Sequence, residues 1–177
     1  MLFRETELAG AFILEPERFI DERGFFARSW SQSESAQRGL ESRIVECNRS
    51  FNVRKGTVRG MHYQVTPFSQ VKIVSCSRGV IYDVIIDLRP GSDTFRRWVS
   101  VELSPENGLM LYVPAGLAHG FQTLRDDTEV AYQMFAAYAP EYARGVRWND
   151  PAFGVSWPLT DEVIINERDR DYPDFQI

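Results

Sequence analysis

The sequence of 177 residues contains only two histidines, His62 within RGMHYQ and His119 within PAGLAHGF. An imidazole changes charge near neutral pH, so each histidine has the chemistry of a general base or of a metal ligand. A lone histidine in a strand is more often buried and hydrogen-bonded to a neighbour. The surrounding residues must therefore decide between catalysis, metal binding and a structural role.

The segment PAGLAH (114–119) resembles the PxGxxH element of cupins, which commonly bind a metal through three histidines and a glutamate. Here Gln64 stands in HYQ where the second histidine of an HxH pair is expected. Two histidines and a carboxylate can bind iron, but the spacing does not favour such a site. The glycine-rich fingerprint of dinucleotide-binding proteins is also missing. The residues therefore do not favour a metal site.

Three other polar side chains lie in apolar, strand-like segments. Lys72 interrupts QVKIV, Tyr132 lies in VAYQMF and Asp83 lies in VIYDVIIDL. A buried lysine can stabilise an oxyanion, whereas a lysine on an edge strand discourages aggregation. A strand tyrosine usually packs in the core, and an isolated aspartate usually lies at the surface. Residue type alone leaves both interpretations open for each of the three.

The composition is typical of one folded domain. Hydrophobic residues make up 44% of the chain and aromatic residues 13%, enough to bury a sizeable core. The net charge of −5 argues against a nucleic-acid or membrane partner. No signal peptide or membrane-spanning run is recognisable, and Cys47 and Cys76 lack a CxxC spacing. We expect a single cytoplasmic domain over residues 1–177.

Short apolar segments separated by turn residues fill most of the chain. The segments that favour strands are AFILEP, FFARSW, RIVECNRSF, TVRGMHYQ, QVKIVSCS, GVIYDVIIDL, RRWVSVEL, LMLYVP, GFQTL and TEVAYQMFAAY. Only SESAQRGL and the residues around PEYAR favour helices, and both are short. Many short strands at regular spacing predict an all-β sandwich or barrel.

Seven motifs occur in one order along the chain. They are FIDERGFF (19–26), GTVRGMHYQ (56–64), QVKIV (70–74), IYDVIIDLRPGSDTF (81–95), PAGLAHGFQTL (114–124), YAPEYARGVRWNDP (138–151) and INERD (165–169). Together they resemble the dTDP-4-dehydrorhamnose 3,5-epimerase family over almost the whole chain. The resemblance implies an all-β, cupin-type jelly roll with short peripheral helices, and a homodimer that binds a nucleotide sugar.

The resemblance also implies a cofactor-independent isomerase. Its substrate is a nucleotide-linked 4-keto-6-deoxy sugar, and the expected reaction converts dTDP-4-dehydro-6-deoxy-D-glucose to dTDP-4-dehydro-L-rhamnose. The C3 and C5 protons are acidic because they neighbour the C4 ketone. A base removes one of them to form an enolate, and an acid returns a proton to the opposite face.

Five residues of this chain match the family's catalytic positions. His62 matches the general base, and Asp169 would fix its tautomer and raise its basicity. Lys72 would stabilise the C4 enolate oxygen, with Asp83 orienting it. Tyr132 matches the proton donor.

Eight further residues match binding positions, and arginines among them suit a diphosphate because guanidinium donates in pairs. They are Arg23, Phe26, Asn48, Arg59, Gln64, His119, Tyr138 and Arg168. Arg28 and Ala143 stand where many members have ligand-contacting glutamates. Two alternatives remain: an epimerase that acts at C3 or C5 alone on another nucleotide sugar, such as a CDP- or GDP-linked one, and a metal-dependent cupin oxygenase or non-catalytic sugar-binding cupin.

The segment RGMHYQ contains a geometric conflict. In a regular strand, Arg59 and His62 lie on opposite faces because side chains alternate. The epimerase interpretation needs both near one ligand. We therefore predict a bulge or twist at Gly60, or a ligand that reaches Arg59 around the strand end.

Overall fold

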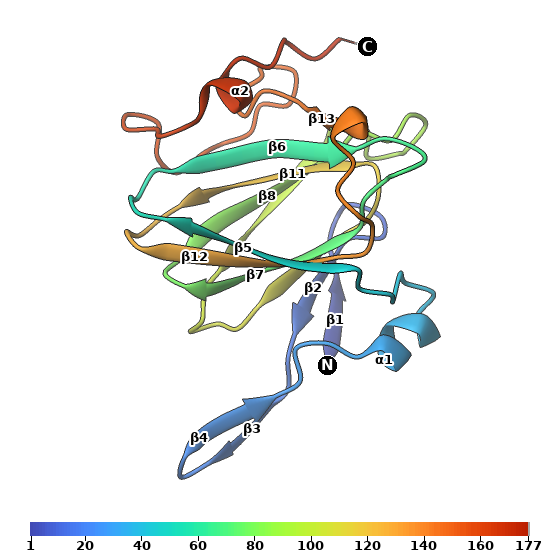
Figure 1. Ribbon diagram of the computed structural model, residues 1–177, viewed down its shortest axis with the longest axis vertical. Helices are drawn as coiled ribbons and strands as arrows, with labels where there is room; N and C mark the ends of the chain where they lie inside the picture. Colours follow the sequence, from blue (N-terminus) through green and yellow to red (C-terminus); the bar gives the residue numbers. More distant parts are fainter. Residues whose placement is uncertain (177) are drawn as a thin grey trace.

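Two antiparallel sheets face each other in this protein (Figure 1). The computed structural model describes residues 1–176. One sheet has the order β1-β2-β10-β7-β12-β5, and the other the order β13-β6-β11-β8-β9. The strands are β1 (Leu2–Glu5), β2 (Phe12–Glu15), β5 (Glu46–Asn52), β6 (Val58–Gln64), β7 (Lys72–Arg78), β8 (Ile81–Asp87), β9 (Trp98–Leu103), β10 (Met110–Val113), β11 (Leu117–Thr123), β12 (Thr128–Met134) and β13 (Ala143–Gly145). This architecture confirms the predicted all-β jelly roll.

Strand β8 is buried on both faces. Ile81 and Ile85 point between the sheets and pack in the main core. Val84 and Ile86 point the other way, into a second core covered by the chain after β13. Alternation therefore places Asp83 between the sheets, where it is fully buried. The surface position that its isolation favoured is wrong.

Strand β6 carries the predicted bulge. It pairs with β11 through His62↔His119 and Arg59↔Phe121, so two residues of β6 oppose Gly120 alone. Gly60 adopts a φ of 134°, a region that favours glycine. The extra residue returns Arg59 and His62 to one side of the strand, and both line the same cavity.

Three short helical segments lie at the periphery. α1 (Gln32–Gln37) begins at Ser31, whose side chain accepts a hydrogen bond from the Glu34 backbone N–H. A 3₁₀ helix, η1 (Pro140–Tyr142), lies in the PEYAR region, and both were predicted. The one-turn helix α2 (Glu167–Arg170) was not predicted. Within residues 1–176, no helix is long and apolar enough to cross a membrane.

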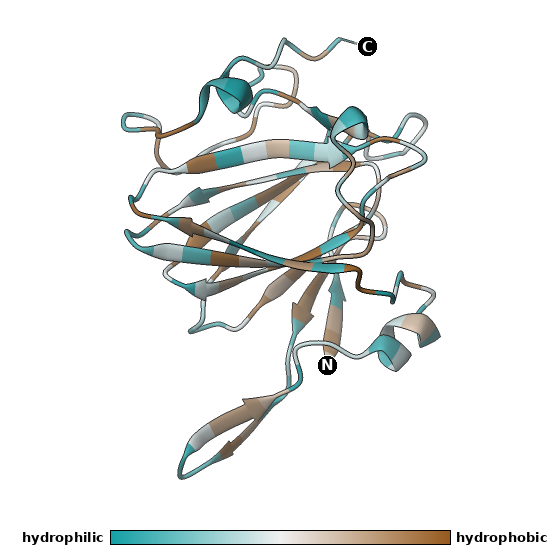
Figure 2. Ribbon diagram, in the orientation of Figure 1, coloured by the Kyte–Doolittle hydropathy of each residue, from teal (hydrophilic) through white to brown (hydrophobic). Residues whose placement is uncertain are grey.

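The hairpin of β3 (Arg18–Asp21) and β4 (Gly24–Ala27) projects away from the two sheets (Figure 1). Its strands are largely apolar, as Figure 2 shows, yet their side chains are exposed. Phe19, Ile20 and Phe26 have exposed fractions of 68%, 80% and 71%. Arg18 fixes the base of the hairpin by donating hydrogen bonds to the backbone carbonyls of Pro105 and Glu106.

Candidate active site

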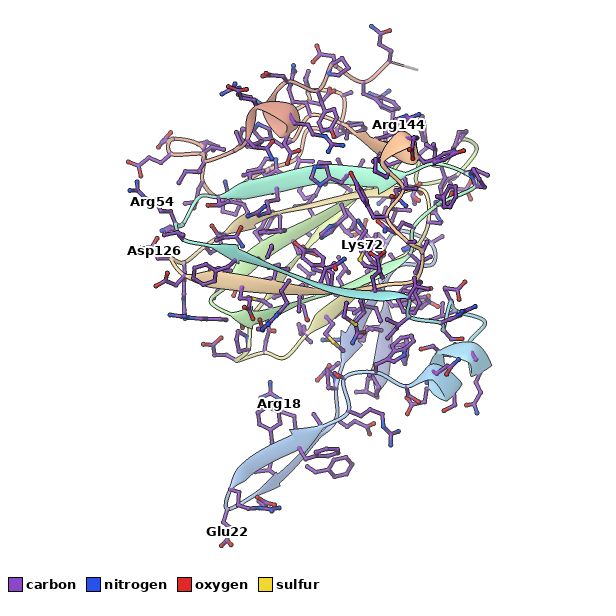
Figure 3. All side chains as sticks on the ribbon, viewed as in Figure 1. Arg18, Glu22, Arg54, Lys72, Asp126 and Arg144 are labelled. Carbon is purple, nitrogen blue, oxygen red and sulfur yellow. The ribbon has the colours of Figure 1, made fainter. Side chains whose placement is uncertain are left out.

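A cavity of about 350 Å³ opens between the two sheets and is closed on one side by α2. Ten of the predicted site residues line it: Asn48, Arg59, His62, Gln64, Lys72, His119, Tyr132, Tyr138, Arg168 and Asp169. Figure 3 shows Lys72 in the space between the sheets. The cavity thus gathers residues that are up to 121 positions apart in the sequence, Asn48 and Asp169.

His62 forms a tight pair with Asp169. His62 Nε2 lies 2.7 Å from Asp169 Oδ1, while Asp169 Oδ2 accepts a hydrogen bond from the Gly60 backbone N–H at 3.1 Å. The helix α2 holds the carboxylate in place because Asn166 caps it, accepting from the Asp169 backbone N–H at 2.7 Å. When Nε2 donates to Asp169, His62 Nδ1 keeps its lone pair and can take up a proton.

Charge and burial act on Asp169 in opposite directions. Burial alone would raise the pKa of Asp169, but the hydrogen bond and charge of His62 outweigh it and hold that pKa below its usual value. The carboxylate is therefore ionised at neutral pH. An ionised carboxylate stabilises the imidazolium that forms when the ring accepts a proton.

A second pair lies deeper, where His119 Nε2 is 2.8 Å from Asp83 Oδ1. Burial lowers the pKa of His119 and raises that of Asp83, and the mutual attraction of the pair opposes both shifts. Lys72 is buried beside them, and desolvation lowers its pKa to about 8 although the charge of Asp83 opposes this. Asp83 Oδ2 is buried and has no hydrogen-bond partner among the described residues. Lys72 thus provides a buried positive charge held near a carboxylate.

Tyr132 lies on β12, in the sheet opposite His62. Burial raises the pKa of Tyr132 to about 12, so its hydroxyl stays protonated through the physiological range. Its oxygen lies 3.2 Å from Ser50 Oγ on the neighbouring strand β5. The ring also packs edge-on against His119, with centroids 6.5 Å apart.

The other predicted binding residues differ in how many of their polar groups already form hydrogen bonds within the protein. Arg59 Nε donates to Asn52 Oδ1 at 2.7 Å, which directs the guanidinium along the cavity wall. The Gln64 amide is committed to the backbone: it donates to the carbonyls of Phe68 and Ala137 and accepts from the Ala139 N–H. Gln64 therefore shapes the wall and has no free amide hydrogen.

Arg23 and Phe26 are not brought to this cavity. Both lie on the projecting hairpin, where Arg23 forms an ion pair with Asp21 at the turn between β3 and β4. Arg28, which the family resemblance sets at the position of a ligand-contacting glutamate, is paired with Glu34 of α1. Ala143, at the other such position, does line the cavity.

Eight of the lining residues were not predicted as site residues, and two of them have a signal in the sequence that could have identified them. Ser50 is two residues from Asn48, so strand alternation alone would have placed both on one face. Asn166 lies within INERD, and its role as a helix cap could have been recognised from the polar residue before ERD.

A larger hollow of about 840 Å³ lies at the surface, between the β5–β6 turn and residues 158–164. Charged side chains of both signs line it, including Arg54 and Asp126, which Figure 3 labels at one edge of the sheets. It has no histidine or tyrosine. The acid–base groups therefore make the smaller cavity the candidate active site. Within residues 1–176, no group of three or more His, Cys, Asp or Glu side chains is arranged to hold a metal ion.

Comparisons with known proteins identify the family to which the chain is similar. The family model described as dTDP-4-dehydrorhamnose 3,5-epimerase matches residues 5–176. A protein of that name from Sinorhizobium fredii is 42% identical over 98% of this chain and 89% of its own length. The crystal structure of the corresponding protein of Elizabethkingia anophelis superposes with a TM-score of 0.95 at 36% identity, covering 99% of this chain and 96% of that one. A structure of the Bacillus anthracis protein with TDP and PPi bound has a TM-score of 0.93 at 38% identity, covering 98% and 99%.

These relatives confirm the resemblance, the cupin-type fold and the assignment as an isomerase. The match extends over nearly the whole chain in every case. The chain belongs to the dTDP-4-dehydrorhamnose 3,5-epimerase family.

Proposed function

We propose that the protein inverts C3 and C5 of dTDP-4-dehydro-6-deoxy-D-glucose to give dTDP-4-dehydro-L-rhamnose. The observation that carries this proposal is the placement of a base and an acid on opposite walls of one cavity. His62 lies on β6 of the five-stranded sheet, and Tyr132 lies on β12 of the six-stranded sheet. Inversion needs a proton to leave one face of a carbon and another to arrive at the opposite face.

His62 begins the reaction at Nδ1. The C–H bond beside the ketone breaks, its electron pair forms the C=C bond of an enolate, and the C4 oxygen takes the negative charge. Asp169 holds the imidazolium that results. General-base catalysis of this kind contributes about 10²–10⁴ in rate.

Lys72 lies on β7, the strand that pairs with the Tyr132 strand β12, and stabilises the enolate oxygen. A preorganised positive charge in a site shielded from water is worth about 10²–10³ in rate at related oxyanion sites. The negative charge of Asp83 favours this ammonium, and His119 is hydrogen-bonded to the same Asp83.

Tyr132 completes each inversion. Its O–H bond breaks and a new C–H bond forms on the face opposite His62, while the enolate collapses back to the ketone. Solvent then returns a proton to the phenolate and accepts one from the imidazolium. The steps are proton transfers and exchange no electrons with a cofactor.

Arginines at the cavity suit the diphosphate of the substrate. Arg59 and Arg168 both line it, and guanidinium recognises phosphate through paired hydrogen bonds. Tyr138 is half exposed at the cavity wall, where its ring can stack on the nucleotide base. TDP and PPi bound to the Bacillus anthracis relative support a nucleotide diphosphate as the recognised group.

The projecting hairpin supports a homodimer. Its exposed apolar side chains, Phe19, Ile20, Phe25 and Phe26, need a partner surface to be shielded from water. A second copy of the chain would also explain Arg23 and Phe26, which can reach a cavity only on another molecule. The free thiols of Cys47 and Cys76 suit the reducing cytoplasm, where we place the protein.

Incubation with dTDP-4-dehydro-6-deoxy-D-glucose in deuterated water tests the function. Proton NMR should show deuterium entering at both C3 and C5, with inversion at each. Incorporation at one position alone would identify a single-position epimerase. If no position exchanged with this or any other 4-keto nucleotide sugar, the proposal would be wrong.

A further inference from the structure

The hydroxyl of Ser50 is the only side-chain group that hydrogen-bonds the Tyr132 phenol within residues 1–176. The Ser50 Oγ and Tyr132 Oη atoms are 3.2 Å apart. Register explains the contact: β5 pairs with β12 through Val130↔Ser50 and Tyr132↔Asn48, so Ser50 lies diagonally next to Tyr132 on the cavity side. No motif of the sequence pointed to Ser50.

We propose that Ser50 is a positioning residue that donates a hydrogen bond to Tyr132 Oη, so that the phenol proton points at the substrate. The inference rests on the proposed function, because it assigns Tyr132 as the acid. It adds a residue that acts through Tyr132 and touches no reacting atom.

The direction of the hydrogen bond follows from the chemistry. A phenol has one proton, and a phenol that donates this proton to Ser50 cannot deliver it to a carbon. A phenol that accepts from Ser50 keeps its proton free for the cavity. The same Ser50 O–H then faces the phenolate that remains after transfer, and a hydrogen bond to a charged acceptor is about twice as strong as a neutral one.

The surroundings of Tyr132 make this contact important. Burial raises the pKa of Tyr132, and the nearby charge of Asp83 raises it further. The hydrogen bond from Ser50 and the charge of Arg59 act in the opposite direction. Arg59 is itself held by Asn52, so two residues of one face of β5 support the acid. Of these two groups, only the charge of Arg59 remains in Ser50→Ala to favour the phenolate.

Ser50→Ala tests the proposal by separating two rates that NMR in deuterated water measures together. The rate of deuterium incorporation reports proton removal by the base His62, and the rate of inversion reports proton delivery by the acid Tyr132. With His62 intact, we expect exchange with retention to continue while inversion falls about 10- to 100-fold, the cost of a hydrogen bond to a developing charge. KM should stay within a few-fold of the wild-type value, because substrate does not need this hydroxyl to bind.

Two further variants control for a loss of inversion that comes only from damage to the structure. Ser50→Thr keeps a hydroxyl and should recover most of the inversion rate. Ser100→Ala removes a comparable contact, between Ser100 Oγ and Tyr82 Oη at 2.7 Å, that lies outside the cavity. It should leave both rates unchanged. Equal losses of exchange and inversion in Ser50→Ala, or equal losses in the alanine and threonine variants, would overturn the proposal.

A measurement without substrate separates this proposal from the proposed function. In protein labelled with ¹³C at tyrosine Cζ, the signal missing in Tyr132→Phe belongs to Tyr132. It should shift in Ser50→Ala and stay in place in Ser100→Ala. A wild-type protein that exchanges no proton of the sugar would refute the function whatever this signal does. An active wild-type protein with unchanged inversion in Ser50→Ala would refute the role of Ser50 alone.

Discussion

Arg59 and His62 line the same cavity although strict alternation along their strand would place them on opposite faces. The bulge that inserts one residue into β6 opposite Gly120 brings them together. The same backbone turn directs the Gly60 N–H at Asp169, which in turn holds His62. One local irregularity therefore brings together Arg59, which we propose binds phosphate, His62, the proposed base, and the carboxylate that holds His62.

Gly60→Ala should disrupt this arrangement and destabilise the protein. A Cβ at Gly60 would lie 2.5 Å from the Gly120 Cα, and the φ of 134° adds strain. Gly91→Ala is a matched control, since Gly91 also has a positive φ but no atom within 4 Å of its added Cβ. We expect Gly91→Ala to cost about 1–2 kcal/mol of unfolding free energy and Gly60→Ala clearly more. Denaturant unfolding measures both, and equal costs would contradict the close approach.

Asp169→Asn should lower kcat by about 10²–10⁴ with little change in KM. The amide is nearly the same size, but it removes the charge that stabilises the His62 imidazolium and can present an N–H to the ring. His62→Ala should abolish deuterium exchange altogether. Far-ultraviolet circular dichroism checks that both variants fold. Full exchange activity in folded His62→Ala would show that another group is the base.

Local patterns in the sequence predicted ten of the thirteen strands, because alternation and turn residues act over few positions; the short strands β1, β3 and β13 were missed. The bulge at Gly60 was predicted because the family resemblance requires Arg59 and His62 near one ligand, whereas strict alternation separates them. The burial of Asp83 could not be predicted from local patterns. Its hydrogen-bond partner His119, which stabilises the buried carboxyl group, is 36 positions away. Helix α2 was not predicted because a single helical turn is too short to show a recognisable hydrophobic periodicity.

The direction of the β3–β4 hairpin could not be predicted either. Its strands contain adjacent large apolar residues, as buried strands do, and only the tertiary structure shows the hairpin projecting into solvent (Figure 2). The family resemblance placed Arg23 and Phe26 among the ligand contacts, but it does not say from which molecule they come. Residue motifs indicate the role of a residue more readily than its location in the folded molecule.

Activity should fall as the pH rises above about 8. Burial lowers the pKa of Lys72 to about 8, so the ammonium that stabilises the enolate is charged below that pH and neutral above it. Tyr132, with a pKa near 12, stays protonated over the same range. The pH profile of kcat/KM, which reports the groups of the substrate-free protein, should therefore show one alkaline limb. Lys72→Met should remove this limb along with about 10²–10³ of the rate. A limb that persisted in Lys72→Met would belong to another group.

The exposed hairpin predicts a dimer that surface substitutions can break. Ile20→Ser with Phe26→Ser removes two large apolar side chains that contact little in the single chain, so the folded chain should lose little stability. Sedimentation should show the mass falling toward the 20.4 kDa of one chain, with loss of activity at the same protein concentrations. Glu22→Ser, at the hairpin tip labelled in Figure 3, is the control and should leave the dimer intact. A wild-type protein that sediments as a monomer with full activity would refute both the dimer and any role of the hairpin in a neighbouring cavity.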